Sequence, residues 1–444
     1  MNSLENVIEG GFCIGCGTCT YMNKDSQMQW NKKGELIPVF EIKDLEKTNL
    51  CPFSDESKDE SYLANIFFGD QLNSDNIIGK FSNLYVGQVK SNDILKNSSS
   101  GGILTWINKK LLDLNMVDGI IAVKESSNGS LFEYEICSKS SELKYFAKSR
   151  YYPAHLGNVL KKIKNDGKKY ALVTLPCFAK SIRNLQLVDE ELKKSIPFIF
   201  TLICGHLKTK NYSEYLGWQS DILPKDLTKI DFRVKDKNQP ASKYSISVSN
   251  SKSKKLMPFN DLKYNDWGLG LFKPKACDFC DDVFGELGDL TVGDAWLPEY
   301  LNDDSGNSVV IIRNEIIDSI FIDYSSELNI KQLSKNDLLK SQKGGISHKR
   351  SGLRVRLNYY SDLLKITPKK RMALIPGIIK EKDKQKFLKR MQVSERSHSS
   401  FIKAKNKEDF NIFFNEMEPY VKSYYKTLRP LYIRVLRYIR NFIR

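Results

Sequence analysis

Three cysteines near the start of the chain have a spacing that suits a metal cluster. Cys13, Cys16 and Cys19 form a Cys-x-x-Cys-x-x-Cys run with two glycines inside it, and Cys51-Pro52 follows. This run is typical of 4Fe–4S sites, where one tight loop presents three thiolates and a cysteine before proline adds the fourth. A four-cysteine zinc site is the alternative, but it normally uses two separated pairs. We therefore predict a 4Fe–4S cluster on Cys13, Cys16, Cys19 and Cys51.

A second set of four cysteines is spread along the middle of the chain. Cys177 and Cys204 each come just after an apolar, strand-like run, and Cys277 and Cys280 form a Cys-x-x-Cys pair. In open α/β sheets, ligands gather beyond the ends of the strands, so the four thiols could share one cluster there. Alternatively, Cys177 and Cys204 are ordinary buried thiols and the pair is redox-active or binds zinc. The ninth cysteine, Cys137, is interpreted as a bystander.

Other residues could bind an anion or move protons. The Ser-Gly loop at 98–102 leads into a helical pattern, and free N–H groups at a helix start suit a pyrophosphate; a flexible linker is the alternative. Lys148 and Arg150 could neutralise negative charge, or belong to a solvated basic face. His206 could donate to a cluster sulfur or be a hydrogen-bonded structural histidine.

Alternating apolar runs predict the elements that must position these groups. Strand-like runs alternate with helical patterns, which favours an α/β domain with a mixed sheet. The strands are expected at 84–89, 119–123, 170–175 and 196–203, and the helices at 103–114 and 156–165. Shorter alternating runs predict antiparallel strands within 229–260 and a hairpin within 28–39. Asp289 and Asp294, in the run 288–296, are interpreted as fixing a turn rather than transferring protons.

Composition divides the chain into three predicted parts. They are a ferredoxin-like module at 1–55, an α/β domain at 80–345 and a basic helical extension at 353–444. The net charge of +16 belongs to the end of the chain, because residues 343–444 hold 26 Lys and Arg against 8 Asp and Glu. Only this region is therefore expected to need an acidic partner. No apolar run is long enough to span a membrane and no signal peptide is recognisable, so we expect a cytoplasmic protein with reduced thiols.

The last residues of the chain predict an amphipathic helix. Its arginines and its aliphatic residues recur on different faces: Arg434, Arg437, Arg440 and Arg444 on one, Ile433, Leu436, Ile439 and Ile443 on another. Aromatic residues accompany them: Tyr424, Tyr425, Tyr432 and Tyr438. This pattern suits an anionic membrane surface at the inner face of the membrane, or a partner protein. A helical extension packed on the core is the alternative. No recognised nucleic-acid module occurs, so no nucleic-acid partner is expected.

The motifs of the middle region, taken in order, resemble a known family. The Ser-Ser-Ser-Gly-Gly loop (98–102) is followed by Lys-Ser-Arg-Tyr (148–151), Leu-Pro-Cys-Phe (175–178), Cys204, the Cys277 and Cys280 pair, and Gly-Asp-Leu-Thr-Val-Gly-Asp-Ala-Trp (288–296). Over about residues 1–345 the chain resembles the coenzyme F420 hydrogenase/dehydrogenase beta subunits, with an added ferredoxin-like module. It departs from many members in having one cysteine triad rather than two, and Phe178 where glutamine is common.

The resemblance implies two kinds of cofactor. It implies a flavin in the α/β domain, FAD rather than FMN, and a second 4Fe–4S cluster on the cysteines of the middle region, Cys177, Cys204, Cys277 and Cys280. No residue is singled out as catalytic. The residues expected to hold the flavin are Ser99, Ser100, Gly101, Gly102, Lys148, Ser149, Arg150, Tyr151 and Pro176.

The resemblance also implies a function. A flavin-dependent iron–sulfur oxidoreductase would pass electrons between a small organic substrate and a ferredoxin-like carrier through two clusters. Bacterial members of the family occur in surface-polysaccharide pathways, so a sugar or glycan intermediate is one candidate substrate. The alternative is a non-catalytic electron-transfer subunit that docks on a partner enzyme and lacks a substrate pocket.

Overall fold

An eight-stranded mixed sheet forms the centre of the molecule. The computed structural model describes residues 3–22, 26–40, 48–236, 239–240, 242–371 and 379–428. The strand order is β15-β5-β14-β13-β9-β8-β6-β7, and the four strands β13, β9, β8 and β6 run parallel to one another. The strands are β5 (Asn83–Val89), β6 (Gly119–Glu125), β7 (Phe132–Cys137), β8 (Tyr170–Thr174), β9 (Phe198–Leu202), β13 (Leu290–Asp294), β14 (Ser308–Ile312) and β15 (Leu328–Gln332).

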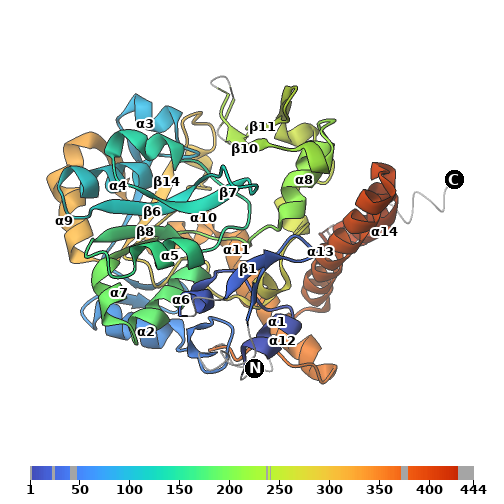
Figure 1. Cartoon of the computed structure of the whole chain (residues 1–444), viewed down its shortest axis with the longest axis horizontal. Helices are drawn as coiled ribbons and strands as arrows, with labels where there is room; N and C mark the ends of the chain where they lie inside the picture. The colour runs from blue at the N-terminus through green and yellow to red at the C-terminus, as the bar shows by residue number, and fades with distance from the viewer. Residues whose placement is uncertain are drawn as a thin grey trace.

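Both faces of this sheet are covered, which explains why its central strands read as apolar runs. Alternate residues of β9 point to opposite faces: Phe198 and Phe200 pack with α4 (Ile103–Asp113) and α9 (Glu315–Asp323), whereas Ile199 packs with α5 (Gly157–Ile163) and α6 (Pro176–Gln186). The strands and helices predicted in this region are all present, within a few residues. The predicted mixed α/β fold is confirmed (Figure 1).

The N-terminal residues fold against this domain and share its core. They contain α1 (Leu4–Glu9) and the predicted hairpin, formed by β1 (Gln27–Trp30) and β2 (Leu36–Val39). Phe12 and Ile14 are buried in the same apolar cluster as residues of α5 and α6. Further short elements complete the chain: α2 (Glu60–Phe68), β3 (Asn73–Asp75), β4 (Gly79–Phe81), α3 (Asn92–Lys96), α7 (Glu190–Ser195), α10 (Lys335–Ser341) and α11 (Lys343–Ile346).

A small antiparallel sheet and the C-terminal helices form a second layer of packing. The predicted antiparallel strands are β10 (Lys229–Val234), β11 (Ser245–Ser249) and β12 (Lys254–Pro258), which lie near α8 (Lys210–Trp218) (Figure 1). The C-terminal helices are α12 (Gly352–Asp362), α13 (Glu381–Lys407) and α14 (Phe410–Leu428). Phe401 and Phe413 join Tyr215 and Phe272 in one aromatic core, so α13 and α14 are packed on the body of the protein.

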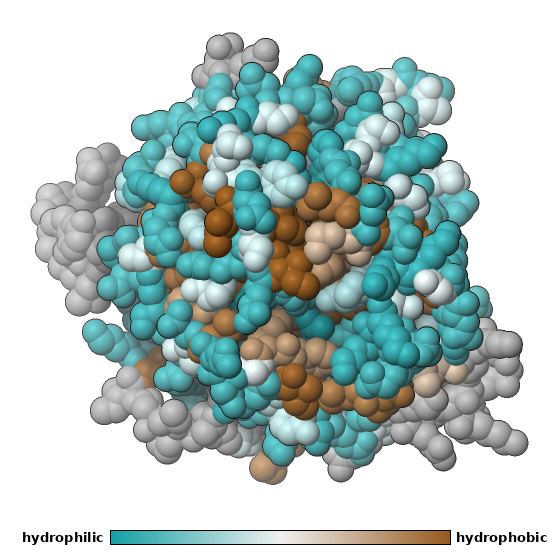
Figure 2. All heavy atoms as spheres, turned by 90° about the vertical axis from the view of Figure 1, so that its left-hand side faces the viewer, coloured by the Kyte–Doolittle hydropathy of each residue, from teal (hydrophilic) through white to brown (hydrophobic). Residues whose placement is uncertain are grey.

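For Tyr424 the structure agrees with the alternative of a helical extension packed on the core, rather than with a membrane surface or a partner. This side chain is 2% exposed and lies in the aromatic core, because α14 turns that face toward the body of the protein. Tyr432, Tyr438 and the amphipathic pattern at 433–444 lie outside the described residues. No helix in the described ranges is long and apolar enough to cross a membrane. Hydrophilic side chains cover most of the face shown in Figure 2, with a band of hydrophobic ones across its middle.

Part of the basic charge of the extension is paired within the molecule rather than with an external partner. Arg371 forms ion pairs with Asp281 and Glu286, and Arg356 forms one with Asp278. The carboxylates of these pairs are almost fully buried. The extension therefore supplies cations to a buried acidic segment of the α/β domain.

The packing of α13 makes the stability of the protein sensitive to acid. His398 is 4% exposed and its ring contacts the Lys273 carbonyl at 3.1 Å. Burial lowers the pKa of His398 to about 4, from an ordinary value near 6.5. Between these two pKa values the unfolded chain binds a proton at His398 that the folded chain does not. The neutral, buried His398 therefore gives its full contribution to stability above about pH 6.5, and this contribution is lost as the pH falls toward 4.

We expect the free energy of unfolding to decrease by about 2 kcal/mol as the pH falls from about 7 to about 5, because of His398. Denaturant unfolding at several pH values measures it. In the variant His398→Gln, whose amide can still donate to the carbonyl but does not titrate, the loss should be smaller. Equal pH slopes for the two proteins would contradict the assignment.

Candidate functional site

A cavity of about 300 Å³ opens where the parallel strands end. Thr174 of β8, Leu202 of β9 and Asp294 of β13 are the last residues of their strands, and all three line it. The carboxyl ends of parallel strands are where α/β sheets bind ligands, because the following loops diverge there. The cavity therefore lies at the position that the topology favours for a ligand.

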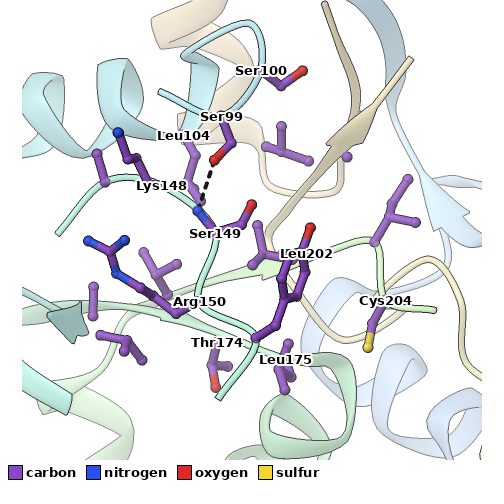
Figure 3. Close-up of a pocket in the computed structure, with 18 of the residues that line it drawn as sticks. Ser99, Ser100, Leu104, Lys148, Ser149, Arg150, Thr174, Leu175, Leu202 and Cys204 are labelled. Carbon is purple, nitrogen blue, oxygen red and sulfur yellow. Dashed lines mark hydrogen bonds between the residues drawn. The ribbon is translucent and has the colours of Figure 1, made fainter. Parts of the chain in front are cut away.

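Two loops form one side of the cavity and are tied together. The Ser99 hydroxyl accepts a hydrogen bond from the backbone N–H of Ser149 at 2.9 Å, as Figure 3 shows. Gly102, the residue that caps the start of α4, has φ of 76°, a left-handed conformation that favours glycine. Lys148 has φ of 74°, an uncommon value for a residue with a side chain, and its ammonium pairs with Asp231 of β10. These bonds hold Ser149 and Arg150 at the cavity wall.

Seven of the nine residues expected to hold a flavin line this cavity; the other two do not. Gly101 lies behind the wall, where a Cβ would approach the Gly87 carbonyl to 2.5 Å, so its role is close packing. Pro176 is the first residue of α6 and is buried. The Ser100 hydroxyl donates to the Asn307 carbonyl at 2.7 Å and is already used within the protein. The seven lining residues are Ser99, Ser100, Gly102, Lys148, Ser149, Arg150 and Tyr151.

Four buried polar atoms on the cavity wall have no partner within the described structure: Oδ1 of Asn108 and Nε of Arg233, and the two that matter most here, Nε of Arg150 and Nε2 of His206. Burial lowers the pKa of Arg150. Burial, followed by the nearby Lys208 and Arg390, holds the pKa of His206 well below its usual range, so this ring is neutral. An orphaned buried donor or acceptor costs free energy unless a ligand satisfies it. The Arg150 and His206 atoms fit a polar ligand in the cavity.

Aromatic rings and further cations complete the wall. Trp267 stacks on His206 with ring centroids 4.6 Å apart and contacts Tyr151 at 4.9 Å. The Lys208 ammonium lies 4.4 Å from the centroid of the Trp267 ring. Arg233 forms an ion pair with Asp294 at 2.8 Å. The wall thus combines flat apolar rings with cations, as a planar anionic ligand requires.

The structure brings the second cysteine set together beside this cavity. Cys204 follows β9 and lines the cavity, and Cys177 lies in the first turn of α6. Burial raises the pKa of Cys177 well above its usual value, and Cys280, Cys204 and Cys277 add to the effect. The backbone N–H of Leu207 contacts the Cys277 sulfur at 3.3 Å. The four thiols are therefore close enough to repel one another once ionised, which a shared metal cluster would compensate.

The N-terminal cysteines also converge. Cys13, Cys16, Cys19 and Cys51 line one small hollow of about 20 Å³. Burial, followed by Cys16, raises the pKa of the Cys51 thiol to about 12. The backbone N–H of Gly15 contacts the Cys13 sulfur at 3.4 Å. A tight loop with N–H groups turned toward sulfur is the environment that a 4Fe–4S cluster requires.

The arrangement of the thiols differs from that of a single-ion site. Within the described ranges, no three His, Cys, Asp or Glu side chains are placed to share one metal ion. A 4Fe–4S cluster does not require that arrangement, because each thiolate binds a different iron. Cys137 belongs to neither set; it is buried and its sulfur contacts the Lys139 carbonyl at 3.3 Å.

One helix joins the two cysteine sets. Cys177 lies in the first turn of α6, and Ser181 follows one turn later. The Ser181 hydroxyl is 3.6 Å from the Cys16 sulfur. One α-helical turn rises only about 5.4 Å. We call Cys177, Cys204, Cys277 and Cys280 the inner set, and Cys13, Cys16, Cys19 and Cys51 the N-terminal set. The N-terminal set, the inner set and the cavity therefore lie in series.

Several residues around the site give no signal in the sequence. Lys208, Arg233, Lys349 and Arg390 are buried cations here, yet in the sequence they resemble ordinary surface charges. Arg390, from α13, donates to the Gly268 carbonyl at 2.6 Å and contacts Nδ1 of His206 at 3.4 Å. The burial of these cations can be recognised only from the tertiary structure, in which the C-terminal helices pack on the domain.

The mixed α/β domain, with its cavity at the strand ends beside converging thiols, matches known proteins in sequence. Two family models match: the coenzyme F420 hydrogenase/dehydrogenase beta subunit N-terminal part over residues 84–161, and its C-terminal part over residues 167–336. Together they span more than half of the chain. The chain belongs to the coenzyme F420 hydrogenase/dehydrogenase beta subunit family, a family of electron-transferring oxidoreductase subunits.

Curated relatives are distant in sequence. The coenzyme F420-dependent sulfite reductase of Methanocaldococcus jannaschii is 22% identical over 364 residues, 76% of this chain and 50% of the relative. The F420-dependent formate dehydrogenase subunit beta of the same organism is 26% identical over 207 residues, 46% of this chain and 51% of the relative. The chain thus spans about half the length of these two relatives.

A solved structure shows the same fold. A chain of the F420-reducing NiFe hydrogenase complex from Methanosarcina barkeri superposes with a TM-score of 0.51 at 16% identity. The match covers 68% of this chain and 100% of that chain. The coenzyme F420 hydrogenase subunit beta of Methanococcus voltae is 22% identical over 288 residues, 58% of this chain and 94% of the relative.

Proposed function

We propose that this protein is a flavin-dependent iron–sulfur oxidoreductase that passes electrons between a ferredoxin-like carrier and a small organic substrate. The observation that carries the proposal is the series of three sites described above. Cys204 belongs to the inner thiols and lines the cavity, while Ser181 contacts Cys16 of the N-terminal thiols. A flavin in the cavity would exchange two electrons with a substrate and one at a time with a cluster.

The residues of the cavity have definable roles in this proposal. The N-terminus of α4 and Arg150 would bind the phosphates of the flavin, with FAD favoured over FMN because a helix start and a separate cation can share a pyrophosphate. Trp267 and Tyr151 offer apolar faces to a ring system. His206, neutral and with Nε2 unpartnered, can hold a hydrogen bond to the flavin or to the substrate.

The same geometry bears on the alternative, a non-catalytic electron-transfer subunit. Such a subunit needs no substrate pocket, whereas this chain has a cavity with unsatisfied polar groups next to Cys204. The cavity favours an enzyme. A sugar or glycan intermediate is one candidate substrate, with oxygen atoms that polar groups of the cavity could bind.

Anaerobic purification of the full chain tests the proposal. We expect flavin absorbance and about eight irons per chain, from two 4Fe–4S clusters. The variant Arg150→Met should lower the flavin content, whereas Lys144→Met, an exposed lysine outside the cavity wall, should leave it unchanged. A colourless, iron-free preparation that binds zinc would overturn the proposal.

A further inference from the structure

Lys349 is a buried cation that touches the inner cysteine set. It is 3% exposed and lies in a π-helical segment, Ser347–Ser351, beyond residue 336 where the family match ends. Its ammonium lies 3.2 Å from the Cys280 sulfur and donates to the Asp282 carbonyl at 2.5 Å. Burying an ammonium costs free energy unless a negative group compensates it. Cysteine sulfurs that bind a cluster as thiolates, Cys280 among them, would provide that compensation.

No carboxylate within the described ranges forms an ion pair with Lys349. Asp282, whose carbonyl it contacts, directs its carboxylate to the backbone N–H groups of Gly285 and Glu286, at 2.8 Å and 3.0 Å. The charge of the ammonium is therefore directed at sulfur. The Leu207 N–H at the Cys277 sulfur adds a second positive dipole to the same set.

The N-terminal set has a different electrostatic environment. Lys180 is the cation that acts on Cys51, but it is paired with Glu60 at 3.4 Å, and both side chains are buried. The carboxylate of Glu35 acts on Cys13. No cation contacts a sulfur of this set as closely as Lys349 contacts Cys280 in the part of the chain that the structure describes. The inner set thus has a cation in direct contact with one of its sulfurs, at 3.2 Å, which the N-terminal set lacks within the described residues.

We propose that Lys349 raises the midpoint potential of the inner centre and places it above that of the N-terminal centre. This inference rests on the proposed function, because it needs both clusters. A positive charge beside a cluster sulfur stabilises the reduced state, which carries one more negative charge. Lys349 thereby favours transfer of one electron from the N-terminal centre, which is oxidised, to the inner centre, which is reduced. The ferredoxin-like carrier supplies that electron, so electrons run toward the cavity.

Anaerobic redox titration of the full chain, followed by electron paramagnetic resonance, tests the inference. In the wild type the inner centre should be reduced first; its signal is the one missing from Cys204→Ala. In Lys349→Met and Lys349→Gln the potential of that centre should shift to more negative values, with about eight irons retained. Lys349→Arg, which keeps the charge, and Lys343→Met, an exposed lysine nearby, should match the wild type.

Three outcomes would overturn the inference. The first is an unchanged inner potential in the neutral variants with both clusters present. The second is reduction of the N-terminal centre first in the wild type. The third is loss of the inner iron in both neutral variants but not in Lys349→Arg, which would assign Lys349 to holding the cluster. A wild type without two clusters would instead contradict the proposed function.

Discussion

Replacement of Cys204 by alanine should separate the cavity from its supply of electrons. Cys204 is the cysteine of the inner set that lines the cavity. Under the proposed function, its loss removes both a cluster ligand and the contact between the two sites. We expect the iron content to fall from about eight to about four per chain. Bleaching of the flavin absorbance by reduced ferredoxin should slow roughly 10- to 100-fold, since changes around a metal centre commonly cost that much.

Cys137→Ala is the matched control for this experiment. Cys137 is a buried core residue whose sulfur contacts the Lys139 carbonyl, and it lies outside both cysteine sets. Its replacement should leave the iron content and the bleaching rate unchanged. A Cys204→Ala protein that keeps about eight irons would remove Cys204 from the cluster.

Asp289→Ala should lower the free energy of unfolding by more than the titration of His398 does. The Asp289 carboxylate accepts hydrogen bonds from Ile199 N–H at 2.7 Å, from Arg183 at 2.9 Å and from Asn314 at 3.0 Å. It thereby joins β9, α6 and the start of α9, and the Arg183 pair is buried on both sides. Removing one partner leaves a buried charge unpaired, which costs about 3–5 kcal/mol.

Denaturant unfolding measures this loss, with Asp113→Ala as the control. Asp113 forms an exposed pair with Lys109 on α4, and such pairs contribute about 1 kcal/mol or less. Equal losses for the two variants would show that Asp289 does not hold the elements together.

The central strands could be predicted because their burial leaves a local mark. Strands covered on both faces must be apolar at every position, and the runs at 119–123 and 170–175 show this directly. Tyr424 could not be placed in the same way. An amphipathic helix has the same pattern whether its apolar face meets a membrane or a neighbouring helix, and here it meets the aromatic core around Phe413.

The basic extension shows the same limit for charge. A sequence reports how many cations a segment has but not which of them are buried. Arg371 and Arg356 are paired with acidic residues of the 278–286 segment, far away along the chain. Charge pairs of this kind depend on how helices dock, so no window of sequence can reveal them.

The two cysteine sets mark the boundary between what the sequence determined and what the tertiary structure decided. The convergence of Cys13, Cys16 and Cys19 follows from spacing, because seven residues in one tight loop can present three thiols only to a common point. The approach of Cys177, Cys204 and the Cys277–Cys280 pair depends on the strand order β13-β9-β8. The position of Lys349 depends on the docking of the C-terminal segment, since contacts between distant residues exist only once the chain has folded.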